Sequence, residues 1–260
     1  MTGKVYLVGA GPGAPDLLTL RAARLIEAAD VVLHDALVHP ATLALAGRAR
    51  LIDVGKRYGK VSTEQRFINR ALIEAARTHG IVVRLKGGDP MLFGRAQEEI
   101  DALEAAGIDC EVVPGVTSAL AAAASLRTSL TRRGIARTVA FLTPRVGRDE
   151  PASSWTPAAI EADTVVLYMA AGASQSIAAQ LIESGKPAHT PAVLVESATL
   201  ENERRTFTTL AALAAEPLPR AEGPVVMAVG EVFRNANATC NELLRQVHHR
   251  DDYRRSALDR

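Results

Sequence analysis

The stretch Arg84-Leu-Lys-Gly-Gly-Asp-Pro-Met-Leu-Phe-Gly-Arg95 decides the fold. A hydrophobic strand ends abruptly in two glycines, an aspartate and a proline, and a helix is expected to begin near Arg95. Paired glycines let a ligand contact bare backbone because they have no Cβ. Open α/β sheets bind their ligands at the carboxyl ends of strands. The stretch therefore predicts an α/β fold with a small-molecule site where this strand ends.

Strand-length apolar runs alternate with helical periodicity on both sides of this stretch, which is typical of βα units and mostly parallel sheets. In the first half we expect strands over 5–8, 31–34, 51–54, 81–85 and 111–113, and helices over 16–29, 64–79 and 96–106. In the second half we expect strands over 138–142, 164–168, 192–196 and 225–229, and helices over 174–184 and 210–215.

These elements predict two α/β lobes, each with a mostly parallel five-stranded sheet, and a cofactor cleft between them. We expect the N-terminal lobe over residues 1–114 and the C-terminal lobe over 115–236, because a strand gives way to an alanine-rich helix around 113–118. Residues 237–260 are expected to form a charged tail, whose last ten residues have no apolar face to bury.

The composition excludes several classes of protein. Hydrophobic residues make up 48% of the 260 residues and charged residues 23%, so a sizeable core is expected. A net charge of +1 argues against nucleic acid or an anionic membrane as the partner. Cys110 and Cys240 belong to no disulfide or zinc pattern, so no metal site is expected. No signal peptide precedes the first strand, and we expect a cytoplasmic protein.

A second glycine loop, Gly9-Ala-Gly-Pro-Gly-Ala14, fits the G-x-G-x-x-A pattern of dinucleotide-binding proteins, and Asp35 follows the second strand. Two details count against a dinucleotide. Pro12 removes an N–H from the turn that would cradle a pyrophosphate, and Asp16 places an acidic residue in the expected first turn of the helix. We favour a cofactor without phosphates, with a nicotinamide- or flavin-dependent oxidoreductase as the alternative of another class.

With both glycine loops placed, the chain resembles the uroporphyrinogen-III C-methyltransferases of the tetrapyrrole-methylase superfamily, from Val5 to about Phe233. The matching segments are Val-Gly-Ala-Gly-Pro-Gly (8–13), Asp-Ala-Leu-Val (35–38), Val-Gly-Lys-Arg (54–57), Arg-Leu-Lys-Gly-Gly-Asp-Pro (84–90), Phe-Gly-Arg (93–95), Val-Pro-Gly-Val-Thr-Ser (113–118), Leu-Thr-Arg-Arg (130–133), Tyr-Met (168–169) and Val-Gly-Glu-Val (229–232). Their order and spacing carry the resemblance more than any one motif does.

The resemblance implies the tetrapyrrole methylase fold, a homodimer, and S-adenosyl-L-methionine bound in the cleft. The implied cofactor contacts are Pro12, Gly87, Gly88, Asp89, Leu92, Thr117, Ser118, Met169 and Ala198. This cofactor carries a sulfonium, an amino-acid end and an adenosine but no phosphate, which agrees with loops that offer backbone atoms.

The implied substrate, uroporphyrinogen III, bears eight carboxylates, so its pocket needs guanidinium or ammonium groups. The candidate cations are Lys56, Arg57, Arg95, Arg132 and Arg133. Glu98 lies one helical turn after Arg95 and is expected to orient its guanidinium.

The implied reaction methylates two pyrrole carbons, at positions 2 and 7, and gives precorrin-2 and S-adenosyl-L-homocysteine. Precorrin-2 is a precursor of sirohaem and of cobalamin. The family assigns a proton-acceptor role to the position of Asp35 and a donor role to that of Lys56, and Arg95 is a rival base. An arginine base is awkward because its pKa exceeds ~12, so we favour Asp35 as acceptor and Arg95 as a substrate clamp.

The chain departs from the family pattern in its expected pocket. His34 replaces a tyrosine, Arg132 replaces a histidine, and Ala170 and Ala198 replace glycines. Two further hypotheses therefore stay open, a methylase of another corrin precursor and a non-catalytic relative that binds the cofactor.

Overall fold

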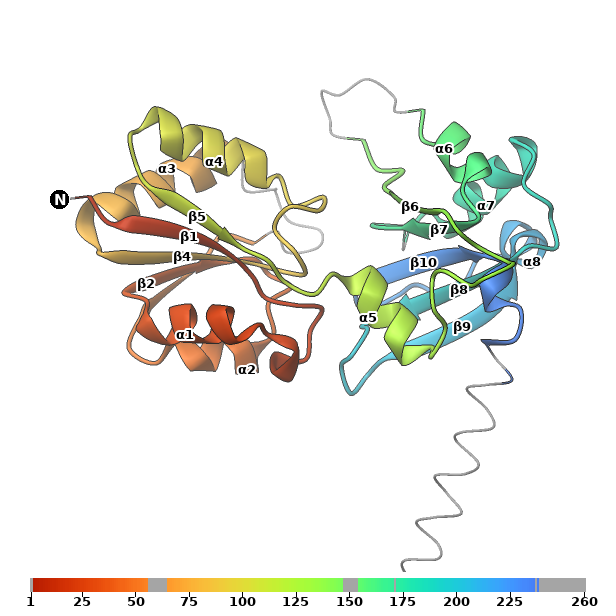
Figure 1. Cartoon of the computed structure of the whole chain (residues 1–260), viewed down its shortest axis with the longest axis horizontal. Helices are drawn as coiled ribbons and strands as arrows, with labels where there is room; N and C mark the ends of the chain where they lie inside the picture. The colour runs from red at the N-terminus through yellow and green to blue at the C-terminus, as the bar shows by residue number, and fades with distance from the viewer. Residues whose placement is uncertain (1, 56–64, 147–153, 171, 237, 239–260) are drawn as a thin grey trace, which may run out of the picture. The chain divides into compact units, whose positions relative to one another are not determined.

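The computed structural model describes residues 2–55, 65–146, 154–170, 172–236 and 238 (Figure 1). The chain divides into two compact units, one formed by Met1–Ala121 with Thr199–Glu201 and the other by Ala122–Ala198 with Asn202–Arg260. Each unit contains one five-stranded sheet. The expected two-lobed α/β architecture is therefore confirmed.

The sheet of the N-terminal unit is parallel throughout and has the order β3-β2-β4-β1-β5. Its strands are β1 (Lys4–Gly9), β2 (Val31–His34), β3 (Arg50–Asp53), β4 (Ile81–Lys86) and β5 (Cys110–Val113). Each lies within a residue or two of the expected range. The central strand β4 contains the first three residues of Arg84–Arg95, the stretch from which the fold is predicted.

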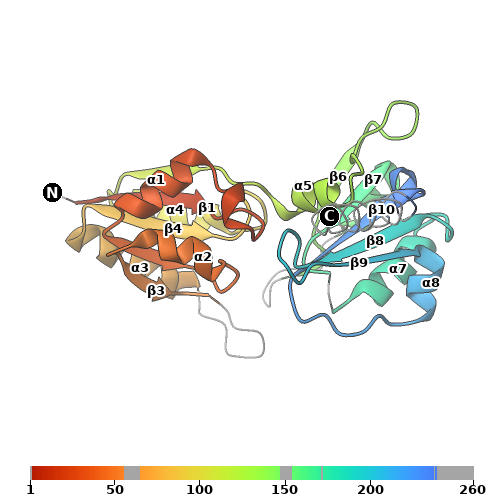
Figure 2. The same ribbon diagram turned by 90° about the horizontal axis from the view of Figure 1, so that it is seen from below.

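Helices cover both faces of this sheet (Figures 1 and 2). On one face α1 (Leu20–Ala28) and α2 (Pro40–Leu43) pack over a core that includes Ile26 and Val83. On the other face α3 (Gln65–Thr78) and α4 (Ala96–Ala105) pack over a core that includes Leu72 and Leu103. Short 3-10 turns, η1 (Pro15–Leu17) and η2 (Ala44–Ala46), complete the first face.

Local sequence explains where two of these helices begin and end. Thr19 caps α1, because its side-chain oxygen accepts a hydrogen bond of 3.1 Å from the backbone N–H of Ala22. Gly107 follows α4 with φ +67°, the left-handed conformation in which many helices end.

The sheet of the C-terminal unit has the order β6-β7-β10-β8-β9. Only β6 and β7 are parallel, and the other three pairings are antiparallel. The expectation of a mostly parallel sheet is therefore wrong for this unit. The strands are β6 (Val139–Leu142), β7 (Thr164–Leu167), β8 (Pro191–Glu196), β9 (Arg204–Thr209) and β10 (Val225–Gly230).

The connection between β8 and β9 explains the difference. Only residues 197–203 join these two strands, whereas a parallel crossover needs about a dozen residues or more. The core of this unit lies between the sheet and α6 (Thr156–Glu161), α7 (Ser174–Glu183) and α8 (Leu210–Ala215), and includes Ile177, Leu181 and Leu213. The remaining elements are α5 (Ser118–Ser125), within which the two units meet in sequence, and η3 (Glu231–Phe233).

In the described part of the chain, none of the helices combines the length and apolar character needed to cross a bilayer.

Candidate functional site

Two glycine loops lie side by side at the carboxyl edge of the N-terminal sheet. They follow β1 and β4, which are neighbours in the sheet, and the helices that come after them cover opposite faces. This is the switch point at which open α/β sheets bind ligands. Gly11 and Gly88 join the loops by two backbone hydrogen bonds, of 3.2 and 2.7 Å. Both glycines have a positive φ, of +74° and +69°, which ordinary side chains disfavour.

A third loop, after β5, packs against the first two without room for a side chain. A Cβ on Gly115 would lie 2.3 Å from the carbonyl oxygen of Gly88 and 2.8 Å from the Cα of Gly9. The carboxylate of Asp89 fixes this arrangement, because it accepts hydrogen bonds from the backbone N–H groups of Gly115, at 2.9 Å, and Met91, at 2.8 Å. The three loops therefore form one glycine platform, composed of Gly9, Gly11, Gly88, Asp89 and Gly115.

The platform is unsuited to a dinucleotide. The N–H and the carbonyl of Gly11 are both engaged by Gly88, so this turn does not form a phosphate cradle. The α-helix begins only at Leu20, well beyond Gly13, so its N-terminus does not meet the glycine turn as it does in dinucleotide-binding folds. Geometry thus agrees with the sequence argument for a ligand without phosphates.

Four charged side chains meet beside this platform, beneath α4. Glu99 is fully buried, and its Oε1 accepts from Arg84 Nε at 3.2 Å and from Lys86 Nζ at 2.9 Å. Arg84 Nη2 also donates to Asp35 Oδ1 at 2.5 Å. We call Asp35, Arg84, Lys86 and Glu99 the charge quartet. Burial lowers the pKa of Lys86, the positive charge of Arg84 lowers it further, and Glu99 opposes both effects.

Sequence reasoning did not assign Arg84, Lys86 and Glu99 to the site. The signal was present in the chain, because Arg84 and Lys86 alternate with apolar residues along an otherwise hydrophobic central strand. Residues at this spacing share one face of a sheet, and both faces of a central parallel strand are buried. Two charges in such a place require a buried partner, and Glu99 on α4 supplies it.

Arg95 stands at the entrance to α4 in a left-handed conformation, with φ 56° and ψ 26°. Its guanidinium forms two hydrogen bonds with the carboxylate of Glu98, from Nε at 2.6 Å and from Nη2 at 2.7 Å. This is the pairing that their spacing predicted. The Arg95 side chain is 48% exposed, so Glu98 orients a cation that faces solvent.

The other predicted residues of the N-terminal unit lie on or beside the glycine platform. Gly87 is exposed at the end of β4, while Pro12 and Leu92 are half-buried in the first two loops. Thr117 and Ser118 are half-buried where α5 begins. The predicted cofactor residues of this unit therefore gather at one edge of its sheet.

Met169 and Ala198 belong to the C-terminal unit. Met169 follows β7, is 47% exposed and has a positive φ of 57°. Ala198 is buried, between Ser197 and Thr199, which have φ values of 51° and 74°. Backbone strain of this kind is concentrated at functional sites. Lys56 and Arg57 lie outside the described residues.

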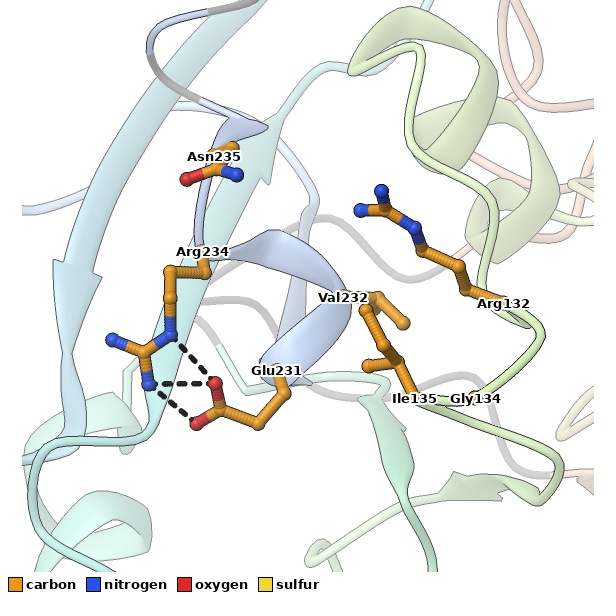
Figure 3. A pocket seen from close by; sticks show the side chains of 7 residues that line it. All are labelled: Arg132, Gly134, Ile135, Glu231, Val232, Arg234 and Asn235. Carbon is orange, nitrogen blue, oxygen red and sulfur yellow. Dashed lines mark hydrogen bonds and ion pairs between the residues drawn. The ribbon is translucent and has the colours of Figure 1, made fainter.

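Arg132 and Arg133 are exposed on the segment that precedes β6. Arg132 lines a cavity of about 430 Å³ together with Gly134, Ile135, Glu231, Val232, Arg234 and Asn235 (Figure 3). Within it Arg234 is paired with Glu231 at 2.7 Å, whereas the guanidinium of Arg132 has no carboxylate partner among the described residues. No group of three metal-ligating side chains occurs in the described ranges.

Comparison with known proteins agrees with this geometry. The family model of tetrapyrrole (corrin/porphyrin) methylases matches residues 4–214. The chain belongs to the tetrapyrrole methylases. It is 44% identical to a uroporphyrinogen-III C-methyltransferase of Pseudomonas aeruginosa, over 90% of this chain and 96% of that protein. It is also 45% identical to a siroheme synthase of Pseudomonas fluorescens, over 90% of this chain but about half (51%) of the relative.

A solved structure shares the fold of this tetrapyrrole methylase. The uroporphyrin-III C-methyl transferase of Thermus thermophilus, in complex with S-adenosylhomocysteine, matches with a TM-score of 0.80 at 42% identity. The match covers 89% of this chain and 99% of the other.

Proposed function

We propose that this tetrapyrrole methylase is an S-adenosylmethionine-dependent uroporphyrinogen-III C-methyltransferase, which makes precorrin-2. The observation that supports this most is the glycine platform, which offers peptide groups at a switch point and no phosphate cradle. The full-length similarity to uroporphyrinogen-III C-methyltransferases agrees with it. The cofactor is S-adenosyl-L-methionine, and the product S-adenosyl-L-homocysteine.

The platform fits the polar groups of this cofactor. A sulfonium and a carboxylate are well served by backbone carbonyl and N–H groups, which glycines leave accessible. The proposed contacts are Pro12, Gly87, Gly88, Asp89, Leu92, Thr117, Ser118, Met169 and Ala198. Asp89 acts chiefly by shaping the loops, because both of its carboxylate oxygens already accept backbone hydrogen bonds.

The reaction needs little more than alignment and a proton acceptor. S-adenosylmethionine, held at the glycine platform, would supply the methyl group to a pyrrole carbon. The methylated ring then loses a proton, for which Asp35 is the acceptor, while Lys56 is a proton donor. Holding carbon, methyl and sulfur in line supplies most of the acceleration, since effective molarities can reach ~10⁵ M or more.

Cations hold the substrate's carboxylates. Arg95, oriented by Glu98, and the exposed Arg132 and Arg133 are the proposed ligands. Guanidinium groups suit this task because they bind carboxylates in a bidentate manner.

One assay tests the proposal. The protein is incubated anaerobically with S-adenosylmethionine and uroporphyrinogen III, and the product is examined by mass spectrometry. We expect a gain of two methyl groups. Methylation of a different corrin precursor, with uroporphyrinogen III untouched, would identify the rival enzyme. Binding of S-adenosylhomocysteine without any turnover would identify a non-catalytic relative.

Asp35→Asn tests the acceptor. The amide keeps the shape of the carboxylate but does not accept a proton, so kcat is expected to fall by about 10²-fold or more. Steady-state turnover measures it, and full activity in this variant removes Asp35 from the chemistry.

We also propose that the protein forms a homodimer, as the family resemblance implies, and that it works in the cytoplasm. Analytical ultracentrifugation tests the dimer, and a monomer at micromolar concentration would contradict it.

A further inference from the structure

The charge quartet holds Asp35 in an unequal way. Asp35 Oδ1 accepts from Arg84 Nη2 at 2.5 Å, while no described residue bonds to Oδ2. The side chain of Asp35 is 31% exposed, and that of Arg84 only 2%. The carboxylate is therefore held at Oδ1 by a buried guanidinium, while its side chain remains partly exposed.

The clamp itself, the Arg84 guanidinium, is fixed from behind. Arg84 Nε donates to Glu99 Oε1 and Arg84 Nη1 donates to the carbonyl of Leu85, each at 3.2 Å. The same carbonyl of Leu85 accepts the backbone N–H of Asp35, also at 3.2 Å. The Arg84 guanidinium and the Asp35 backbone are thus both hydrogen-bonded to one carbonyl of the central strand.

Fold stability alone does not account for this arrangement. Burying two cations and a carboxylate under α4 has a desolvation cost that their attraction only about offsets, and apolar side chains of similar volume serve a core equally well. The desolvation cost is apparent at Lys86, because burial lowers the pKa of its ammonium group. Lys86 is the second cation bonded to Glu99, and Arg84 bonds both Glu99 and Asp35. The four formal charges of the quartet therefore sum to zero.

We propose that Arg84 is a positioning residue for Asp35, with Glu99 and Lys86 as its support. The inference rests on the proposed function and concerns the proton-loss step. As the cation formed by methylation loses a proton, a C–H bond elsewhere in the macrocycle breaks and its electron pair forms a double bond that neutralises the cation. The proton forms an O–H bond with Asp35 Oδ2, while Arg84 keeps Oδ1 in place.

Arg84→Met tests the clamp directly. The variant leaves Lys86 paired with Glu99 inside the core, and Asp35 reaches solvent, so no buried charge is orphaned. We expect kcat to fall about 10- to 100-fold, with KM for uroporphyrinogen III and the Kd of S-adenosylhomocysteine changed less than about threefold. Arg84→Lys, which keeps one donor, is expected to recover part of the loss.

Lys186→Met is the matched control. Lys186 is a buried cation of the other unit, and its Nζ donates to the carbonyls of Ala159 and Ala162 at 2.7 and 2.8 Å. Its removal is expected to lower Tm as much as Arg84→Met does and to leave kcat unchanged.

A double-mutant cycle separates positioning from a general structural effect. If Arg84 acts through Asp35, Asp35→Asn combined with Arg84→Met has the kcat of Asp35→Asn alone. Losses that multiply, or wild-type kcat in Arg84→Met, overturn the inference. A wild-type chain inactive on uroporphyrinogen III overturns the proposed function instead. In that case, crystal structures of the wild type and of Arg84→Met still test the positioning role of Arg84. If the Asp35 carboxylate has the same position in both structures, Arg84 does not position it.

Discussion

Gly115 shows how strongly one residue constrains the candidate site. A Cβ at this position would lie 2.3 Å from the carbonyl oxygen of Gly88, which is backbone and does not move aside easily. Gly115→Ala is therefore expected to push the loops of the platform apart, at a cost of about 1–3 kcal/mol of stability. We also expect S-adenosylhomocysteine to bind at least about tenfold more weakly, which calorimetry measures.

Gly107→Ala is the control for this substitution. Gly107 has φ +67° but open space around its missing Cβ, so alanine there costs only backbone strain. Its expected result is a similar fall in Tm with unchanged affinity. Equal affinity of the Gly115→Ala variant would show that the loops adjust without consequence.

Cys110 gives a prediction that depends on its pKa. Burial above all, followed by the nearby negative charge of Asp109, raises the pKa of this thiol from 9.0 to about 11. Because only the thiolate reacts, its alkylation by iodoacetamide at pH 8 is expected to be about 100-fold slower than that of an ordinary thiol. The experiment uses Cys240→Ser, so that Cys110 is the only cysteine, and urea-unfolded protein is the reference. Equal rates in the two states contradict the prediction.

The raised pKa of Cys110 also makes the free energy of unfolding depend on pH. Between pH 9 and about 11 the unfolded chain has already released the Cys110 proton while the folded chain retains it. The free energy of unfolding therefore falls as pH rises through this window, and Cys110→Ala is expected to reduce that fall.

Among the elements, α4 begins in a strained way. Arg95 at its N-terminus has φ 56°, a conformation that costs a non-glycine residue about 1 kcal/mol or more. Arg95→Gly relieves this strain and removes the proposed substrate clamp. We expect Tm to stay level or rise, while KM for uroporphyrinogen III rises at least about tenfold. Thermal unfolding and steady-state kinetics measure the two effects.

Arg127→Gly is matched to this variant in both residue type and backbone. Arg127 follows α5 with φ 49°, so the same relief of strain is expected with KM unchanged. If both variants gain stability and neither loses activity, Arg95 is no clamp.

The elements also show how far the sequence leads. The parallel strands of the N-terminal unit were predictable because continuous apolar runs such as Val5–Val8 in β1 are typical of sheets buried on both faces. Strand β9 was missed because its six residues, Arg-Arg-Thr-Phe-Thr-Thr, carry one large apolar side chain and form the polar edge of a sheet. Helix α6 was missed because its six residues contain a proline and one large apolar side chain, whereas α8, which has the same length, consists of leucine and alanine alone.

The candidate site likewise has one part that the sequence predicts and one part that it does not. Glycines at strand ends are visible as a pattern, which predicted ligand-binding loops after β1 and β4, and the family resemblance named Gly88 and Asp89 within them. The clamp of Asp35 was not predicted, because it depends on which face of β4 meets α4 and on Glu99 being fully buried there. Those are consequences of packing and not of local sequence.

Over the whole molecule, the formal charges nearly cancel, since 30 Lys and Arg face 29 Asp and Glu. A substrate with eight carboxylates therefore meets local cations rather than a positive protein. The exposed guanidinium groups of Arg95, Arg132 and Arg133 are screened by salt, because the Debye length falls from about 10 Å at 0.1 M to about 3 Å at 1 M. Interactions through backbone atoms in the glycine platform are not screened in this way.

The two ligands are therefore expected to respond differently to ionic strength. Raising salt from about 0.05 to about 0.5 M should increase KM for uroporphyrinogen III several-fold, while the Kd of S-adenosylhomocysteine changes less than about twofold. Arg133→Gln should flatten the dependence of KM on salt, because one screened contact is gone. If KM and Kd depend on salt to the same extent, or if KM does not change with salt, these arginines do not hold the substrate.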